Sequence, residues 1–324
     1  MTSGHQAVMN CSICTSSETS LEQEILYDDR YGYPGLFSIY RCAVCGHIFL
    51  CGNAFTPEFL SRLYSEYYPR SSYEIASHAP APEVRGFRSW LNGERGRAYC
   101  WVPERVRVLD IGCGFGETLG YHAARGCDVY GVEADENIRR VAERFGYKVH
   151  VGLFDADVYE PEFFDYVTLD QVIEHVNNPI EALQGVAKVL NKNGTIILSM
   201  PNANGWGARV FGRRWINWHA PYHVQFFSKR SMELLAEQAG LRVERSFCLT
   251  SSEWLNFQWT HLLTFPEPGR PSSFWSPKVE PSTSVVCGMG LLRRLHRTGI
   301  NHVITRLFDM LGMGDSMIFF MRKI

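Results

Sequence analysis

The sequence predicts an α/β fold with a parallel sheet, preceded by a small metal-binding module. Two patterns carry this prediction. A strand, a glycine-rich loop, a helix and a second strand follow one another from about residue 106, and two closely spaced cysteine pairs lie before residue 50. The chain has 324 residues, 45% of them hydrophobic, which is enough for one large domain with a small companion.

Composition and charge argue against several classes of protein. The formal net charge is −2, so the chain lacks the basic excess of a nucleic-acid-binding protein, and no nucleic-acid partner is expected. No run of roughly 18 apolar residues is present, which argues against a membrane span. The first residues, MTSGHQAVMNCSIC, do not resemble a secretion signal. We therefore expect a cytoplasmic, reducing location, and the ten cysteines need an explanation other than disulfides.

The motifs CSIC and CAVCGH place Cys11, Cys14, Cys42 and Cys45 in a CxxC…CxxC arrangement. Each pair can present two thiolates to one tetrahedral ion, so we predict a structural Zn2+ site in a ribbon-like domain over residues 1–52. The alternative is two unrelated cysteine pairs. His47 is a further candidate ligand that we expect to pack instead. The remaining cysteines are expected to be small buried or loop residues: Cys51, Cys100, Cys113, Cys127, Cys248 and Cys287.

The charges around this module disfavour RNA binding, which many zinc ribbons perform. A phosphate backbone would be repelled by its acidic surface. The acidic residues are Glu18, Glu22, Glu24, Asp28 and Asp29, against Arg30 and Arg41.

A helical connector is predicted over residues 53–103. Its first half has helical spacing of apolar residues, and HAPAPE then interrupts the pattern. The spaced residues are Phe59, Leu60, Leu63, Tyr64 and Tyr67. Tyr67, Tyr68 and Tyr73 either line a substrate pocket or pack the connector on the main domain, and packing is the expectation.

The glycine loop follows a short buried strand near residues 106–109. It reads Gly112-x-Gly114-x-Gly116, and ETLGYHAARG after it predicts a helix that ends at Gly126. CDVYGVEAD is then a second strand, and ENIRRVAERFG a second helix. This is a β-α-β unit with a parallel sheet and a right-handed crossover.

The acidic residues beside the loop indicate which ligand it holds. Dinucleotide-binding loops read GxGxxG and present a helix N-terminus to pyrophosphate. Here Glu117 begins the helix and Asp110 ends the strand, and both would oppose phosphates. They would not oppose a ligand that carries an ammonium and a sulfonium. Glu133 lies where a carboxylate accepts both hydroxyls of a ribose.

These features together resemble the class I S-adenosylmethionine-dependent methyltransferases, whose first motif is (D/E)xGxGxG. The resemblance implies a Rossmann-like seven-stranded sheet in the order 3-2-1-4-5-7-6. FFDYVTLDQVIEHVNNPIEAL, VLNKNGTIILSMPN and FFSKRSMELLAEQAGLRVERSF match strands four to six with their helices, and GDSMIFFMRK matches the antiparallel last strand. It implies a core over residues 104–249, an insertion or lid over 250–312, and a final strand over 313–324.

The resemblance also implies the cofactor, S-adenosyl-L-methionine, and its binding residues. Asp110, Gly112, Gly114 and Gly116 should surround the methionine part, Glu133 should bind the ribose, and Ala134 should border the adenine. Asp155 or Asp157 should meet the adenine amine, and this choice stays open. Asp170 and Gln171 should end the fourth strand beside the sulfonium.

Catalytic candidates are bases near the ends of strands four and five, because methyl transfer requires an aligned and often deprotonated acceptor. QVIEHV offers His175, with Glu174 to orient it, and NWHAPYHVQFFS offers His219, Tyr222 and His223. His223 is the leading base candidate, with His175 and His219 as alternatives. Tyr222 either forms an apolar wall for an acceptor or packs in the core, and the same choice applies to Trp206, Trp215 and Trp218.

Three subfamilies share these marks. Quinone-type O-methyltransferases carry ExxEH at the fourth strand, thought to hold a divalent metal, and Gln171-x-x-Glu174-His175 replaces one carboxylate by an amide. Nucleotide-sugar C-methyltransferases combine a four-cysteine zinc domain with a YHxHxxYFS loop, of which His223 and Phe227-Ser228 remain. Methyltransferases of bacterial polysaccharide and natural-product assembly match the overall layout best.

We therefore expect methyl transfer to a small polar acceptor, such as a sugar nucleotide or a glycan or natural-product precursor. The alternatives are a quinone- or phenol-type O-methyltransferase, an RNA methyltransferase, and a non-catalytic module that binds S-adenosylmethionine. The sequence leaves open whether oxygen, nitrogen or carbon is methylated, and whether a divalent metal sits near Glu174 and His175.

The insertion is predicted to be a mobile proline-rich loop followed by a basic amphipathic helix. Three contacts are open for this helix: its own domain, a second subunit in a homodimer, or an anionic membrane surface. The apolar residues are Leu291, Leu292, Leu295, Ile300, Val303, Ile304, Leu307 and Leu311, and the basic ones are Arg293, Arg294, Arg297 and Arg306.

Overall fold

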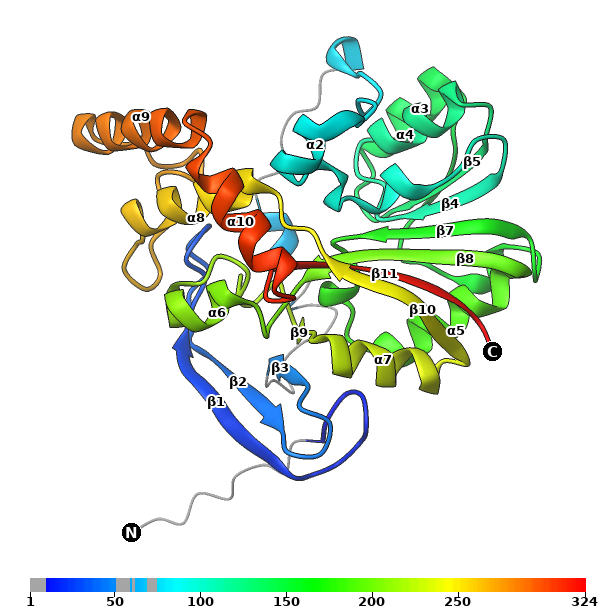
Figure 1. The fold of residues 1–324 in the computed structure, drawn as a ribbon, viewed down its shortest axis with the longest axis horizontal. Helices are drawn as coiled ribbons and strands as arrows, with labels where there is room; N and C mark the ends of the chain where they lie inside the picture. Colours follow the sequence, from blue (N-terminus) through cyan, green and yellow to red (C-terminus); the bar gives the residue numbers. More distant parts are fainter. Residues whose placement is uncertain (1–9, 51–58, 60–61, 69–74) are drawn as a thin grey trace.

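A seven-stranded sheet runs through the centre of the protein in the order β10-β11-β8-β7-β4-β5-β6 (Figure 1). The computed structural model describes residues 10–50, 59, 62–68 and 75–324. The strands are β4 (Arg107–Ile111), β5 (Asp128–Glu133), β6 (Lys148–Val151), β7 (Phe164–Asp170), β8 (Leu190–Pro201), β10 (Leu241–Cys248) and β11 (Ser316–Lys323). Neighbours from β6 to β8 pair in parallel, and β11 is antiparallel to both β8 and β10. The predicted order 3-2-1-4-5-7-6 is confirmed.

Helices cover both faces of this sheet, because successive strand residues point to opposite sides. Leu109 and Ile111 pack on one face and Val108 on the other. α5 (Pro179–Val189) and α7 (Lys229–Gln238) cover the first face. α3 (Glu117–Ala124) and α4 (Ile138–Phe145) cover the second, as Figure 1 shows. The glycine loop therefore opens at the carboxyl end of the middle strand, β4.

The N-terminal sheet is joined to the core. It contains β1 (Thr19–Leu26), β2 (Phe37–Cys42), β3 (Ile48–Leu50) and β9 (Gln225–Phe226), all antiparallel. β9 belongs to the segment after β8, and Ile48 pairs with Phe226 across the junction. Cys11, Cys42 and Cys45 lie in the same buried cluster as Phe227 and Met232. The metal-binding module and the histidine-bearing loop are thus parts of one structure.

The described part of the connector contains short helical turns. These are η1 (Leu63–Tyr67), a π-helical turn, η2 (Ile75–Ser77), α2 (Gly86–Asn92), η3 (Glu94–Gly96) and η4 (Ala98–Trp101). Leu60, Tyr73 and Cys51 lie outside the described residues. Leu63 is buried in a cluster with Tyr31 and Tyr222, and Tyr64 and Tyr67 pack against it. For Tyr67, packing is the interpretation that the structure favours.

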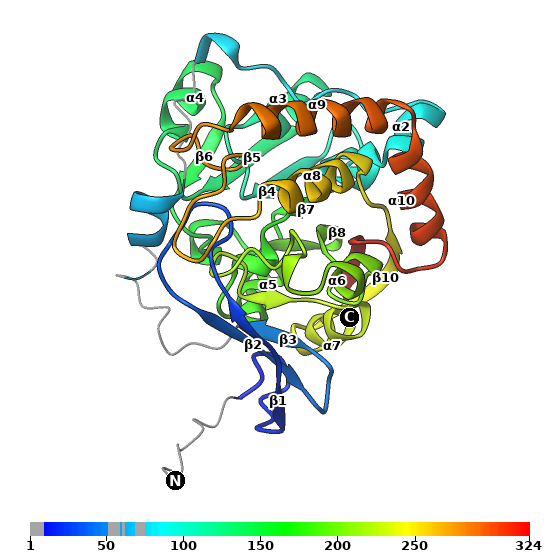
Figure 2. The ribbon, with the colours of Figure 1, turned by 90° about the vertical axis from the view of Figure 1, so that its left-hand side faces the viewer.

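The later part of the insertion is helical, as predicted, but it consists of two helices and not one. α9 (Thr283–Arg297) and α10 (Ile300–Met310) meet at Gly299, whose φ of 88° lies in the left-handed region and ends the first helix. Arg306 is not part of a basic face either. It is 4% exposed, ion-paired with Asp309 at 2.6 Å, and donates to the Trp90 carbonyl at 2.9 Å. α9 lies beside α8 (Ser252–Leu263) in Figure 2.

The proline-rich segment, residues 264–282, is held against the N-terminal module. The Ser272 amide donates to the Arg30 carbonyl at 2.9 Å, and the Tyr27 hydroxyl donates to the Pro266 carbonyl at 2.7 Å. Ser272 is fully buried. This segment is therefore a packed loop where the sequence predicted a mobile one. Among the described residues, none of the helices has the length and apolar character needed to cross a membrane.

Candidate active site

The glycine loop curves around open space. Gly112, Gly114 and Gly116 have φ angles of 75°, 54° and 80°, a region that favours glycine. A Cβ on Gly112 would lie 2.4 Å from the Val172 side chain, so no side chain fits there. A Cβ on Gly114 would meet no atom within 4 Å, so open space, here called the cradle, lies on the Cβ side of this residue. The loop fits a ligand that approaches the backbone closely.

Glu133 is anchored at the tip of this loop. Its Oε2 accepts a hydrogen bond from the Gly114 amide at 2.8 Å, and its Oε1 accepts from the Asp135 amide at 2.9 Å. A carboxylate has about four acceptor positions, so two remain for ribose hydroxyls. Ala134, next to it, is exposed, as expected of a residue that borders a bound ring.

Asp110 supports the loop from beneath. Its Oδ1 accepts from the Thr168 hydroxyl at 2.7 Å, and its Oδ2 accepts from the Thr118 hydroxyl. Burial raises its pKa to about 6. Both oxygens are thus used to fasten β4 to β7 and α3, and the predicted contact of Asp110 with the donor stays a prediction.

The two candidates for the adenine amine have different partners. Asp157 is ion-paired with Lys188 of α5, which lowers its pKa. Asp155 begins η5 (Ala156–Val158), and its Oδ1 accepts from the Asp157 amide at 2.9 Å. Within the part of the chain that the structure describes, its second oxygen has no such bond, which favours Asp155. Leu153 is 82% exposed just after β6, an adenine-wall candidate that the sequence analysis missed.

Asp170 and Gln171 lie at the end of β7, as predicted. Asp170 accepts from Arg97 Nε at 2.6 Å and from the Ser199 hydroxyl. The Gln171 amide donates to the Ser199 hydroxyl at 3.4 Å. Arg97 was missed by the sequence analysis, because nothing in the spacing of the connector marks it. Its side chain is 59% exposed and brings a positive charge to the mouth of the site.

Glu174, His175 and His223 come together from two segments. Glu174 and His175 lie in η6 (Ile173–His175), after β7, and His223 lies in the loop after β8. One ligand atom from each lies within 4.8 Å of the others. The rings of His175 and His223 are 4.7 Å apart and nearly perpendicular, and the His219 ring lies 5.0 Å from that of His223.

The tautomers of the two histidines follow from their partners. His175 Nδ1 lies 2.9 Å from the Tyr222 carbonyl oxygen, and His223 Nδ1 lies 2.8 Å from that of Asn217. A carbonyl oxygen only accepts, so each Nδ1 carries hydrogen and each Nε2 keeps a lone pair. Burial lowers the pKa of His175 to about 4 and that of His223 well below its usual range. Both rings are neutral at pH 7.

Glu174 does not orient His175, contrary to the expectation from the sequence, because the Tyr222 carbonyl performs that role. The Glu174 side chain is 1% exposed, and neither of its oxygens has a hydrogen-bond partner among the described residues. Burial raises its pKa to about 8.

Tyr222, Trp215 and Trp218 are core residues. The Tyr222 hydroxyl contacts Asp28 Oδ2 at 3.4 Å, and its ring stacks on His219 at 4.7 Å. Trp215 and Trp218 pack edge to face inside the cluster that joins β2, β3 and β9. Trp206 stacks on Phe308 of α10. Packing, and not an acceptor wall, explains these rings. His219 keeps a buried Nε2 that lacks a hydrogen-bond partner among the described residues.

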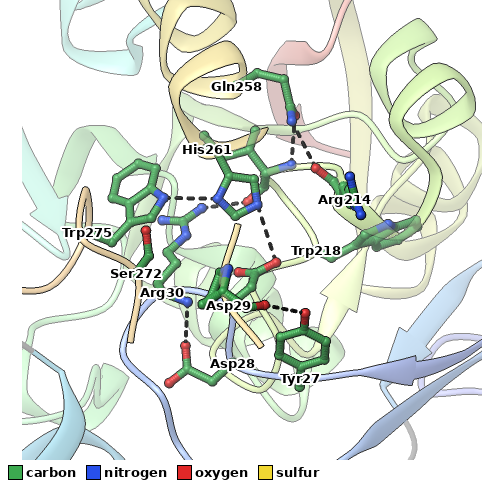
Figure 3. A network of polar contacts seen from close by, with 12 residues as sticks. Tyr27, Asp28, Asp29, Arg30, Arg214, Trp218, Gln258, His261, Ser272 and Trp275 are labelled. Carbon is green, nitrogen blue, oxygen red and sulfur yellow. Dashed lines mark hydrogen bonds and ion pairs between the residues drawn. The ribbon is translucent and has the colours of Figure 1, made fainter. Parts of the chain in front are cut away.

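A polar network joins Asp29 and Arg30 of the N-terminal module to His261 of α8 and to Trp275 (Figure 3). Trp275 Nε1 donates to His261 Nδ1 at 3.1 Å, and His261 Nε2 lies 3.4 Å from Asp29 Oδ2. The Arg30 guanidinium lies 4.2 Å from the Trp275 ring centre and donates to the Ile216 carbonyl at 2.5 Å. Its members are far apart in sequence, so no local motif reveals it.

The four predicted metal ligands form one cluster. One Sγ atom from each of Cys11, Cys14, Cys42 and Cys45 lies within 4.8 Å of the others, with Cys11–Cys45 at 3.5 Å and Cys14–Cys42 at 3.4 Å. A tetrahedral zinc–thiolate site has sulfur–sulfur separations of about 3.8 Å, so the cluster fits zinc. His47 is not one of the residues that form this cluster, and its Nε2 lies 2.8 Å from Gln225 Oε1.

Comparison with known proteins identifies the family. Residues 59–246 match the family model described as a methyltransferase domain, so the chain belongs to that family and is an S-adenosylmethionine-dependent methyltransferase. It is 31% identical over 168 residues to the ubiquinone biosynthesis O-methyltransferase of Pseudomonas fluorescens (strain SBW25), covering 46% of this chain and 72% of that protein. It is 28% identical over 162 residues to the enzyme of the same name from Thiobacillus denitrificans, covering 44% and 70%.

Among solved structures, a SAM-dependent methyltransferase from Archaeoglobus fulgidus is 19% identical to this chain. The match covers 74% of this chain and 96% of that one, with a TM-score of 0.43.

Proposed function

We propose that this chain transfers a methyl group from S-adenosylmethionine to a hydroxyl oxygen of a small polar acceptor. The observation that carries the proposal is the convergence of Glu174, His175 and His223 on the sheet edge that also holds the glycine loop. Ligands of open α/β sheets bind at this edge. The acceptor class that we propose first is a sugar nucleotide or a glycan or natural-product precursor.

The donor would be held by the glycine loop and Glu133. The open cradle at Gly114 accommodates the methionine part, and the free positions of Glu133 accept the ribose hydroxyls. Arg97, whose Nε is ion-paired with Asp170, would use its remaining N–H groups to bind the carboxylate of the donor. When bound, S-adenosylmethionine supplies a methyl group on a sulfonium, and the S–CH3 bond breaks in line as the O–CH3 bond forms.

The cluster supports an oxygen acceptor because a hydroxyl must lose its proton as it is methylated, whereas a neutral amine need not. The Nε2 atom of either His175 or His223 would accept the single hydrogen of the acceptor hydroxyl. His223, the base candidate from the sequence, remains one in this proposal.

A phenolic acceptor is the second candidate. The ubiquinone biosynthesis O-methyltransferases to which the chain is similar support it. The aromatic rings near His175 support it as well. The Tyr64 hydroxyl lies 3.5 Å from His175 Nδ1, and the rings of Tyr64 and Tyr68 pack against Tyr222. A planar ring could stack against such side chains.

The test is transfer of labelled methyl from S-adenosylmethionine to a panel of sugar nucleotides, phenols and bulk RNA. Labelled sugar nucleotide supports the first acceptor class, and labelled phenol alone supports the second. Alkaline treatment and mass spectrometry of the product then locate the methyl group on oxygen, nitrogen or carbon. Labelling of RNA alone, or donor binding without transfer to any acceptor, would refute the proposal.

A further inference from the structure

Glu174 lacks the partners that a buried carboxyl group requires. It is 1% exposed, and neither oxygen is hydrogen-bonded among the described residues. Leaving such a group unpaired is costly, and native proteins nearly always satisfy it with protein atoms, water or an ion. The nearest candidate partners are His175 and His223, whose ligand atoms lie within 4.8 Å. An ion among the three would satisfy the carboxyl group.

The two histidines are prepared as ligands. Each donates its Nδ1 hydrogen to a backbone carbonyl, at 2.9 Å for His175 and 2.8 Å for His223, so each Nε2 lone pair is available. Metal-binding histidines are typically oriented in this way by their second nitrogen. A metal ion binds an imidazole through such a lone pair.

We infer that Glu174, His175 and His223 bind a divalent transition-metal ion, distinct from the ion of the cysteine cluster. Two imidazole nitrogens and one carboxylate suit Zn2+, Mn2+, Fe2+ or Co2+ better than Mg2+, which prefers oxygen ligands. Metal–ligand distances of about 2.1 Å require the three ligand atoms to draw together around the ion.

This ligand set differs from the ExxEH set that the quinone-type resemblance implies. The first position of that motif is Gln171, whose amide donates to the Ser199 hydroxyl. His223, from the loop after β8, supplies the third ligand instead. The ligands in this chain would therefore be mainly imidazoles, whereas those of the ExxEH motif are mainly carboxylates. The loop that carries His223 is then necessary for metal binding.

The ion would lie on the sheet edge where the acceptor is proposed to bind, so its role in holding the acceptor hydroxyl rests on the proposed function. The ion site itself rests only on the cluster. His223 Nε2 cannot bind the ion and accept a proton at the same time. Ion binding and methyl transfer are therefore measured separately.

The test uses the zinc-loaded full chain and Mn2+ as the probe, because Mn2+ prefers oxygen and nitrogen to thiolate ligands. Calorimetry and electron paramagnetic resonance should show one Mn2+ bound per chain. Glu174→Gln and His223→Asn should each weaken binding at least about tenfold, since even the loss of an outer-shell partner has such an effect.

Two variants serve as controls. Gln171→Ala should leave Mn2+ affinity within about twofold if His223, and not position 171, completes the site. His302→Ala, on α10, should do the same. The circular dichroism spectrum and the urea unfolding midpoint of each variant check that it is folded.

A second measurement needs no variant. Loading of the metal-free chain with 113Cd2+ should give two resonances, one typical of four thiolates and one typical of nitrogen and oxygen ligands. A thiolate resonance alone, together with no Mn2+ binding at 1 mM, would overturn the inference. Methyl transfer by a chain that binds no such ion would support the proposed function and overturn this inference. Ion binding by a chain that transfers no methyl group would support this inference and overturn the proposed function.

Discussion

The Gly114 amide donates a 2.8 Å hydrogen bond to Glu133, joining the tip of the glycine loop to the end of β5. The same carboxylate accepts from the Asp135 amide, so two backbone groups hold it in place. Such preorganisation lowers the cost of binding a ligand at this point. The two neighbouring parallel strands thereby form one side of the proposed donor site, which suggests a direct test.

Glu133→Ala should weaken binding of S-adenosylhomocysteine by more than tenfold. The change removes two hydrogen bonds to a charged acceptor, each worth about 1.5–3 kcal/mol. Isothermal calorimetry measures the effect. Glu136→Ala, an exposed position in the same turn, is the matched control and should bind normally. Equal affinities of the two variants would contradict the ribose assignment.

Gly112→Ala should mainly lower the stability of the protein, whereas Gly114→Ala should mainly lower its affinity for the donor. At Gly112 the new methyl group would lie 2.4 Å from Val172 with φ at 75°, so unfolding in urea should show a loss of stability of about 1–3 kcal/mol. At Gly114 the methyl group would enter the open cradle, so donor affinity should fall more than stability. A Gly114→Ala chain that binds S-adenosylhomocysteine as well as the unchanged chain would show that the cradle is not the donor site.

Loss of the metal ion expected in the cysteine cluster should affect the segment that carries His223. Cys42 is buried in the cluster that includes Phe227, and β3 pairs with β9 directly after His223. We expect Cys42→Ser to release zinc, to lower stability by several kcal/mol, and to speed hydrogen exchange at Phe226. Cys287→Ser, exposed on α9, should change none of these. Unaltered exchange at Phe226 after zinc loss would argue that the two regions are independent.

Acid should destabilise the protein through His122. This residue of α3 is fully buried, neither ring nitrogen has a hydrogen-bond partner among the described residues, and burial lowers its pKa to about 4. The unfolded chain takes up a proton below about pH 6.5 and the folded one does not. The free energy of unfolding is therefore unaffected by His122 above pH 6.5. It falls by up to about 3 kcal/mol as the pH falls toward 4.

His122→Leu should remove this pH dependence and leave stability at pH 7 unchanged or higher, as urea unfolding at several pH values would show. His296→Leu, a partly exposed histidine on α9 that is ion-paired with Glu253, is the control. A His122→Leu chain with the original acid sensitivity would assign that sensitivity to other groups.

Local patterns predicted the donor half of the site because strand alternation, the GxGxG spacing and the acidic residue after β5 act over short distances. The positions of Glu133, Asp170 and the four cysteines followed from these patterns, and the strand order followed from the resemblance to class I methyltransferases. The later part of the insertion is helical, as predicted, but the helix is interrupted at Gly299, where the apolar spacing continues across a left-handed residue. Arg306, predicted on a basic face, is instead ion-paired with Asp309 in the interior.

By itself, the sequence determined the fold class, the methyl donor and the four-cysteine cluster, because each depends on residues close together in the chain. Only the tertiary structure decided that His223 meets Glu174 and His175, that β9 extends the N-terminal sheet, and that the tryptophans are core residues. Those contacts join segments distant in sequence. They depend on how the loop after β8 closes over the sheet edge, and no local spacing encodes that path.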